Sequence, residues 1–135
     1  MNLSKNFTLQ ELVASSKASK YNINNTPNAE QLANLKKLAE TVLQPIRDEF
    51  KQPIKVSSGF RCPKVNSLVG GAKNSDHIFG AAADIHTVAD THAENKKLWD
   101  LIIKMTKDGK IKCRQIIDEY NLNWIHVSIN HNKNS

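Results

Sequence analysis

The segment from Ser75 to Asp84 and the later Trp124-Ile125-His126 contain residue types that can bind a metal ion. His77, Asp84 and His126 offer two imidazoles and a carboxylate, a donor set typical of zinc and compatible with other divalent ions. Three protein ligands leave the fourth position of zinc open to water, as in catalytic zinc sites. The pattern therefore predicts a catalytic metal centre.

His77 and Asp84 are seven residues apart, which constrains the backbone between them. On one helix this separation is a rise of about 10.5 Å, too long for both side chains to bind one ion. The chain must therefore fold back, and Gly80 is the residue that permits it. Asp84 then projects from a strand and His77 from the loop before it. From the residues alone, a local packing role for His77 and a salt bridge for Asp84 remain alternatives.

Capping residues and hydrophobic periodicity predict the elements that must position these side chains. A short helix is expected to open at residues 7–12, with Thr8 and Glu11 as a capping box, and to fade over residues 15–19. Further helices are expected at 26–50, with Thr26 as cap and a kink at Pro45, at 64–68 and at 91–107. Strands are expected at residues 54–57, 81–86, 111–119 and 124–129. Residues 130–135 are expected to form a frayed tail. Together these elements predict one α+β domain over residues 1–135, with a small, mostly antiparallel sheet.

Residues 120–123 are predicted to close a hairpin between the last two strands. If the hairpin is symmetric, Ile117 lies opposite His126. Glu119 is then the diagonal neighbour of His126 on the same face, about 7 Å away, and Asp118 points to the other face. A carboxylate there is placed to act as a general base, although a surface ion pair with a lysine explains Glu119 equally well. A β-bulge would bring Asp118 forward instead.

The remaining histidines and the two cysteines are weaker candidates. His86 is expected on the same face of the predicted strand as Asp84 and is an alternative ligand to it. His92 and His131 are expected at the surface. Cys62 and Cys113 lack the Cys-x-x-Cys spacing of a structural zinc site, so we expect two free thiols.

The 135-residue chain is basic, with a formal net charge of +6 and a pI of about 9.4. This charge favours anionic partners such as an acidic cell-wall polymer, with solubility as the simpler explanation. The lysines are scattered, without the arginine-rich or aromatic-interleaved stripe of a nucleic-acid surface, so no nucleic-acid partner is expected. No apolar run approaches the roughly 18 residues that span a bilayer. Residues 1–6 lack a signal-peptide core, which predicts synthesis in the cytoplasm without a signal peptide.

The motif Ser75-x-His77-x-x-Gly80-x-Ala82-x-Asp84 resembles the zinc signature of the D-Ala-D-Ala carboxypeptidase and VanX-like peptidoglycan peptidases, peptidase family M15. Residues 124–128 resemble the last ligand segment of that family. Residues 7–12, 43–47, 57–61 and 65–71 resemble its small phage-type, endolysin-like branch, so the likeness spans most of the chain. The resemblance implies a hedgehog/DD-peptidase-like fold, with N-terminal helices packed on a small sheet that carries the metal site.

The resemblance also implies one Zn²⁺ ion, bound by the three candidate ligands named above. Arg61 would polarise the scissile carbonyl, a role that suits a fixed guanidinium, with a structural ion pair as the alternative. Ser75 would contact the substrate peptide, with a turn cap as the alternative. Glu119 would be the general base that accepts a proton from water.

We therefore expect a monomeric zinc peptidase, either a carboxypeptidase or an endopeptidase, that cleaves a bond in the stem or cross-link peptides of peptidoglycan. Its setting would be phage lysis or cell-wall remodelling, with phage- or prophage-type release to the wall. Many family members carry an acidic residue where this chain has Asn123, and an amide cannot accept a proton from water. This departure favours one alternative, a catalytically silent zinc module that binds wall peptide or a protein partner. A basic phage structural or nucleic-acid-binding protein is the second alternative.

Overall fold

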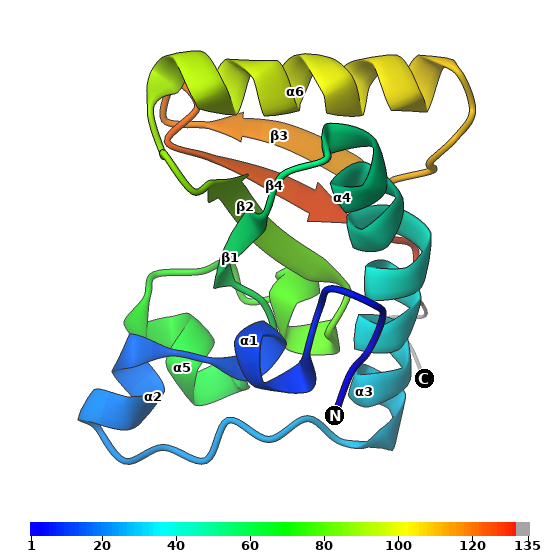
Figure 1. Ribbon diagram of the computed structural model, residues 1–135. Coiled ribbons are helices and arrows are strands. Elements are labelled where there is room, and N and C mark those ends of the chain that lie inside the picture. Colours follow the sequence, from blue (N-terminus) through cyan, green and yellow to red (C-terminus); the bar gives the residue numbers. More distant parts are fainter. Residues whose placement is uncertain (132–135) are drawn as a thin grey trace.

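A computed structural model describes residues 1–131 and contains one four-stranded antiparallel sheet (Figure 1). The strands are β1 (Ile54–Ser58), β2 (Ala82–Thr87), β3 (Gln115–Glu119) and β4 (Trp124–Ser128), in the spatial order β1-β2-β4-β3. The predicted strands are confirmed, although β3 starts at Gln115 rather than at residue 111. Because β2 lies between β1 and β4, residues far apart in the sequence become neighbours in the middle of the sheet.

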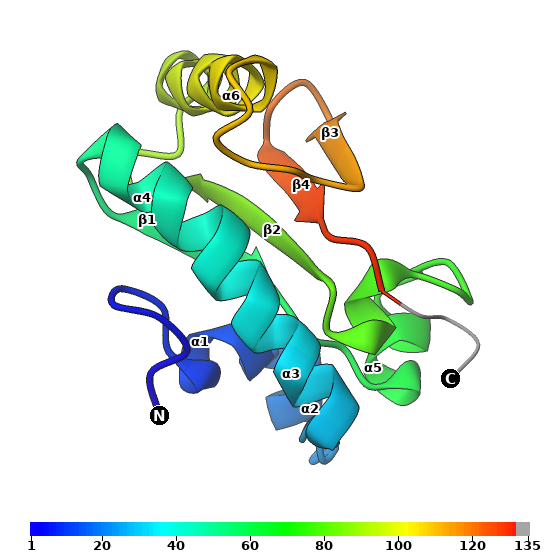
Figure 2. The ribbon, with the colours of Figure 1, turned by 90° about the vertical axis from the view of Figure 1, so that its right-hand side faces the viewer.

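Helices surround this sheet, as expected for the α+β class. They are α1 (Leu9–Val13), α2 (Ser16–Lys20), α3 (Ala29–Leu38), the π-helical turn η1 (Ala39–Leu43), α4 (Gln44–Phe50), α5 (Pro63–Leu68), the 3₁₀ helix η2 (Asp76–Phe79) and α6 (His92–Lys107). Figures 1 and 2 show α3, η1 and α4 as one rod beside the sheet, and Figure 1 shows α6 running along β3 and β4 at the top of the view. In the described part of the chain, no helix is both long and apolar enough to span a membrane.

The helix starts follow their capping residues. Thr8 and Glu11 form the predicted capping box of α1. The long helix begins later than predicted, because Asn28 rather than Thr26 is its cap. The Asn28 side chain accepts from the Gln31 backbone N–H at 2.8 Å, and the Gln31 side chain accepts from the Asn28 N–H at 2.8 Å. This reciprocal pair satisfies two of the backbone donors that the first turn of a helix leaves unpaired.

The predicted kink at Pro45 takes the form of a widened turn. Residues Ala39–Leu43 form a π-helix, and Pro45 follows at the start of α4. Proline has no N–H to donate and its ring crowds the preceding turn, so a widened turn accommodates it within a continuing helix. Ile46, one residue later, stays fully buried in the core.

The two faces of the sheet have different surroundings. In the paired strands β2 and β4, Ala83 lies opposite Val127 and Ile85 opposite Ile125. All four side chains are buried in one hydrophobic core with α3, η1, α4 and α6. The intervening residues of the same strands point to the other face, where the candidate site residues lie.

The segment after β4 continues along the turn that precedes β2. The Ile129 N–H donates to the Ala81 carbonyl at 2.9 Å. The His131 side chain is 1% exposed and stacks on Phe79, with ring centroids 4.6 Å apart. The prediction of a frayed tail and of a surface histidine is therefore wrong at His131, because the imidazole has buried partners. Residues 132–135 lie outside the described part of the chain.

Gly80 reverses the chain between η2 and β2, as predicted, with a left-handed φ of 71°. A Cβ on Gly80 would lie 2.4 Å from the Gln31 carbonyl oxygen, whereas Gly109 has a φ of +75° and open space around it.

We expect Gly109→Ala to lower the free energy of unfolding by about 1 kcal/mol, from backbone strain alone. Gly80→Ala should cost at least about 2 kcal/mol more, because the helix bearing Gln31 must shift. Urea denaturation measures both, and equal losses would contradict this account of Gly80.

Candidate metal centre

His77, Asp84 and His126 meet at the site face of the sheet, from η2, β2 and β4 respectively. Asp84 Oδ1 lies 3.2 Å from His77 Nε2 and 3.0 Å from His126 Nδ1. One candidate ligand atom from each residue lies within 4.8 Å of the others, and all three residues are buried. The side chains brought together by the fold are therefore the three that the sequence motif names, and their role as ligands stays a prediction.

Strand register explains why two of these side chains face each other. Asp84 lies directly opposite His126 in the antiparallel pair β2–β4. His77 reaches the same place because Gly80 turns the chain back after η2. Ser75 caps η2 by accepting from the His77 backbone N–H at 3.2 Å. The predicted fold-back between the two halves of the motif is thus a short 3₁₀ helix closed by a glycine.

Hydrogen bonding sets the tautomer of His77. Its Nδ1 lies 2.7 Å from the Gly59 carbonyl oxygen, which can only accept, so Nδ1 carries the proton. In the neutral ring, Nε2 then presents its lone pair to the Asp84 carboxylate, which is also an acceptor. A bound cation would remove this repulsion, and the Gly59 carbonyl holds the ring through its Nδ1–H, as hydrogen-bond acceptors do for metal-binding histidines. The donor set and its geometry therefore fit a zinc ion.

Asp84 is the electrostatic centre of the group. Burial alone would raise the pKa of Asp84, but the hydrogen bond from His126, together with that from His77 when its ring is cationic, outweighs burial and holds the pKa well below the ordinary range. Arg61 adds an ion pair, with Nη2 at 3.3 Å from Asp84 Oδ2. The carboxylate is consequently ionised at neutral pH, as a metal ligand must be.

Arg61 is held in place by several acceptors. Its Nε donates to Ser58 Oγ at 2.9 Å and its Nη1 to Asn66 Oδ1 at 3.2 Å, in addition to the Asp84 contact. Burial lowers the pKa of Arg61 from its ordinary value, although the Asp84 charge acts in the opposite direction. The guanidinium therefore makes the ion pair considered from the sequence, in a fixed orientation beside the metal ligands.

Glu119 occupies the strand position that the hairpin predicts. Ile117 lies opposite His126 and Glu119 opposite Trp124, without a bulge in β3–β4. Glu119 and His126 both line a cleft of about 280 Å³ on this face. Among residues 1–131, the Glu119 carboxylate has no hydrogen-bond or ion-pair partner. Asp118 is instead exposed and accepts from the Leu122 backbone N–H at 2.6 Å, so the bulge alternative is not found.

The hairpin turn has an unusual backbone that the sequence analysis missed. Tyr120, Asn121 and Leu122 all have positive φ angles, of 51°, 56° and 63°. The Asn123 N–H donates to the Glu119 carbonyl at 3.0 Å and closes one left-handed turn. The asparagines are the only sequence signal for this conformation, since asparagine tolerates it better than most residues. The turn fixes the end of β3 and with it the position of Glu119.

The other histidines considered from the sequence lie away from the cluster. His86 Nδ1 lies 2.7 Å from the Thr87 carbonyl and 3.5 Å from Asp90, so it does not substitute for a ligand. His92 is exposed at the start of α6, as expected. Cys62 and Cys113 are free thiols, and burial raises the pKa of Cys113 to about 11.

A buried ionic cluster at the edge of the site cleft was also missed. Asp76 is 5% exposed and accepts from Arg114 Nη1 at 2.6 Å. The His131 Nε2 lies 2.8 Å from the other oxygen of the same carboxylate. Asp76 stands between Ser75 and His77 in the motif, so these contacts tie the motif to the start of β3 and to the segment after β4. The acidic side chain of Asp76 inside the motif was the one sign of this cluster in the sequence.

Replacement of His131 tests how much this cluster stabilises the fold. We expect His131→Ala to lower the free energy of unfolding by about 1–3 kcal/mol, because the Asp76 carboxylate loses a buried partner. His92→Ala, at an exposed histidine, is the matched control and should change it by less than about 0.5 kcal/mol. Urea denaturation of both variants gives the comparison. Equal stabilities of the two variants would contradict an anchored His131.

Comparison with known proteins places these residues in a family. A sequence model of the family described as peptidase M15 matches residues 5–128, which include every residue of the candidate centre. The chain belongs to the peptidase M15 family. This confirms the resemblance to peptidase family M15, while the small phage-type branch stays a prediction.

A curated protein also matches part of the chain. The zinc D-Ala-D-Ala carboxypeptidase of Streptomyces albus G is 56% identical over 34 residues, which are 25% of this chain. The match spans only 13% of the length of that relative. Identity is therefore high over a short segment, and the activity of the whole relative does not transfer directly to this M15 chain.

Proposed function

We propose that this M15 chain is a monomeric zinc-dependent peptidase that hydrolyses a peptide bond in the stem or cross-link peptides of peptidoglycan. The observation that carries the proposal is the buried cluster of two histidines and one aspartate beside a glutamate in an open cleft, which has no partner among residues 1–131. Membership of the peptidase M15 family and the zinc carboxypeptidase relative support the same chemistry. A setting in phage lysis or cell-wall remodelling, with action at the wall, is part of this proposal.

His77, Asp84 and His126 would hold the zinc ion. Such an ion, when bound, supplies a Lewis acid that acidifies water and polarises a carbonyl group. The Gly59 carbonyl fixes the ring of His77, and the Arg61 ion pair fixes the Asp84 carboxylate. These contacts orient two of the three ligands before any metal binds, which reduces the cost of assembling the site.

Glu119 would be the general base. Its carboxylate lines the cleft beside His126 and has no competing partner among the described residues, so it can accept a proton from the attacking water. The proton then passes to the leaving amine, which completes the hydrolysis of the amide bond. Asn123 lies exposed beyond the hairpin turn, so Glu119 is the acidic residue of the hairpin that lines the cleft.

Arg61 and Ser75 would act on the substrate. The guanidinium of Arg61 is held by Ser58, Asn66 and Asp84, so its remaining N–H groups can donate to the scissile carbonyl oxygen as negative charge develops there. The Ser75 hydroxyl accepts from the backbone of η2 and also lines the cleft, so its hydrogen can donate to a peptide carbonyl.

Metal binding is the first test of this proposal. We expect the purified protein to bind one Zn²⁺ per chain, and Asp84→Asn to weaken binding by more than about 100-fold, because it replaces a charged ligand. His86→Ala is the matched control, because His86 is on the same strand but outside the cluster. Competition with a chromophoric chelator measures the zinc Kd. Equal zinc affinities for wild type and Asp84→Asn would contradict the assigned site.

Turnover of purified peptidoglycan is the second test. We expect Glu119→Gln to lower kcat by about 10²–10⁴-fold and to leave the zinc Kd unchanged, because it removes a proton acceptor and not a ligand. Asp118→Asn, on the other face of the same strand, is the control and should keep wild-type activity. Mass spectrometry of the released peptides identifies the bond.

One alternative is favoured by a specific observation. Asn123 stands where many M15 members carry an acidic residue, which supports a silent zinc module that binds wall peptide or a protein partner. This module would bind zinc and peptide while wild type and Glu119→Gln release equally little product.

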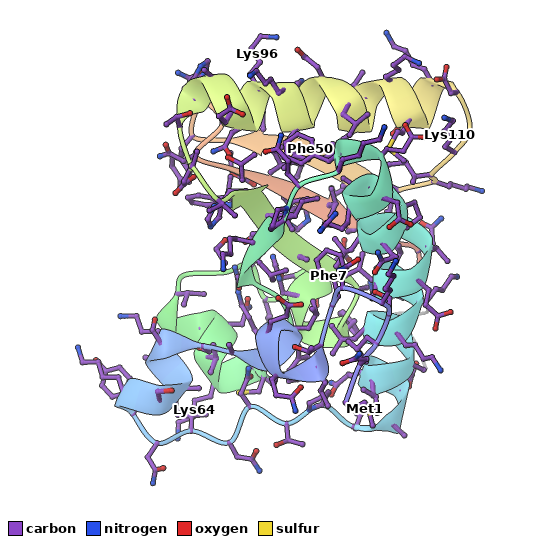
Figure 3. The ribbon with its side chains drawn as sticks, in the orientation of Figure 1. Met1, Phe7, Phe50, Lys64, Lys96 and Lys110 are labelled. Carbon is purple, nitrogen blue, oxygen red and sulfur yellow. The ribbon has the colours of Figure 1, made fainter. Side chains whose placement is uncertain are left out.

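For a nucleic-acid-binding protein, the basic residues are poorly arranged: Lys64, Lys96 and Lys110 lie on separate surface elements (Figure 3). That alternative predicts no bound metal and a steep salt dependence of DNA binding.

A further inference from the structure

A second cleft adjoins the candidate centre on the side of β1. It has a volume of about 320 Å³ and lies between α2, α5 and the site face of the sheet. Asp84 and Arg61 line it at the metal ligands, and Lys17 lines it on α2. Phe60, Val65, Val69 and Trp124 provide apolar walls. The cleft is therefore a pocket of mixed character, with cationic groups and room for a small aliphatic group.

The charges that line this cleft are unbalanced. Asp84 is its one acidic lining residue, and that carboxylate is already shared by Arg61 and two histidines. Lys17 has no hydrogen-bond or ion-pair partner for its amine within residues 1–131. With a divalent cation at the ligands, the excess positive charge increases further. An anionic group of the substrate would balance the charge that the protein leaves uncompensated.

The hydroxyl groups in the cleft are uncharged, so they can add a hydrogen bond to an anion but do not balance its charge. Ser57 Oγ donates to the Asp84 carbonyl, and Ser58 Oγ accepts from Arg61. Ser15 Oγ accepts from the Ala18 N–H and caps α2. Lys17 is thus the cation of this cleft that is free for a ligand, on a short helix fixed by its own cap.

The cleft on the opposite side of the centre has a different charge. There Arg114 is neutralised by Asp76, and Glu119 has no partner among the described residues. The two clefts meet at the metal ligands, since one is lined by Asp84 and the other by His126. The substrate groove is therefore positive on the α2 side and negative on the β3 side, which favours one orientation of a charged peptide.

We propose that Lys17 binds a carboxylate of the peptide substrate in the α2-side cleft and determines specificity for an anionic peptide. This inference rests on the proposed peptidase function. The apolar walls fit a small aliphatic residue next to that carboxylate. The carboxylate has two chemical sources, the α-carboxylate at the end of a peptide and the side chain of an internal acidic residue. The first source corresponds to a carboxypeptidase and the second to an endopeptidase.

Three synthetic stem-type peptides distinguish the sources: one with both carboxylates free, one amidated at its C-terminus, and one amidated at its internal acidic residue. We expect Lys17→Gln to raise KM for the first peptide about tenfold with little change in kcat, because a charge-assisted hydrogen bond is lost. Lys17→Arg should retain most of the affinity. Lys20→Gln, on the same short helix but outside the cleft, is the matched control.

Amidation of the carboxylate that Lys17 binds should abolish the effect of Lys17→Gln on KM. The amidated peptide that shows no such effect therefore identifies the bound carboxylate. An unchanged KM for every peptide that wild type cleaves would overturn the role of Lys17. Calorimetric binding of the same peptides to zinc-loaded Glu119→Gln protein, with and without Lys17→Gln, gives a readout that does not depend on turnover. If wild type cleaves no peptide, the proposed peptidase function fails, while a Lys17-dependent Kd in this binding assay would still support the carboxylate site.

Discussion

The buried Asp84 carboxylate is the constraint on which the rest of the site depends. It is 5% exposed, and an ionised carboxylate removed from water costs several kcal/mol unless cations and hydrogen-bond donors surround it. The chain supplies His77 from η2, His126 from β4 and Arg61 from the segment after β1. Three separate elements must therefore close around one side chain, and a divalent ion would satisfy the same charge more completely.

The sheet makes this arrangement possible because its two faces have opposite chemistry. Ala83 and Ile85 point into the core, while Asp84 between them points to the site face. A register slip of one residue in β2 would bury the carboxylate among apolar side chains and expose Ile85, so the core and the site specify the same register. Gly80 belongs to this constraint, because its left-handed backbone brings η2 against α3 and directs His77 back to the sheet.

Much of this arrangement was predictable from local patterns. The alternation in residues 124–128 and the symmetric hairpin placed Glu119 on the face of His126, and the structure has that register. The spacing of His77 and Asp84 required a reversal, which occurs at Gly80. Such features depend on periodicity and backbone freedom within a few residues, and the amino-acid sequence carries this information directly. The late start of α3 at Asn28 shows the limit, since two neighbouring polar residues were each acceptable caps.

The sequence by itself determined the family motif, the antiparallel α+β fold and the residues available for chemistry. Tertiary structure decided which partners those residues have. Asp76 and His131 are separated by 55 positions, and no periodicity predicts that the tail imidazole is buried against that carboxylate. The clefts on either side of the centre, and the position of Lys17 in one of them, likewise depend on how α2 and α5 pack. Long-range contacts of this kind follow from the packing of whole elements, which local sequence patterns do not encode.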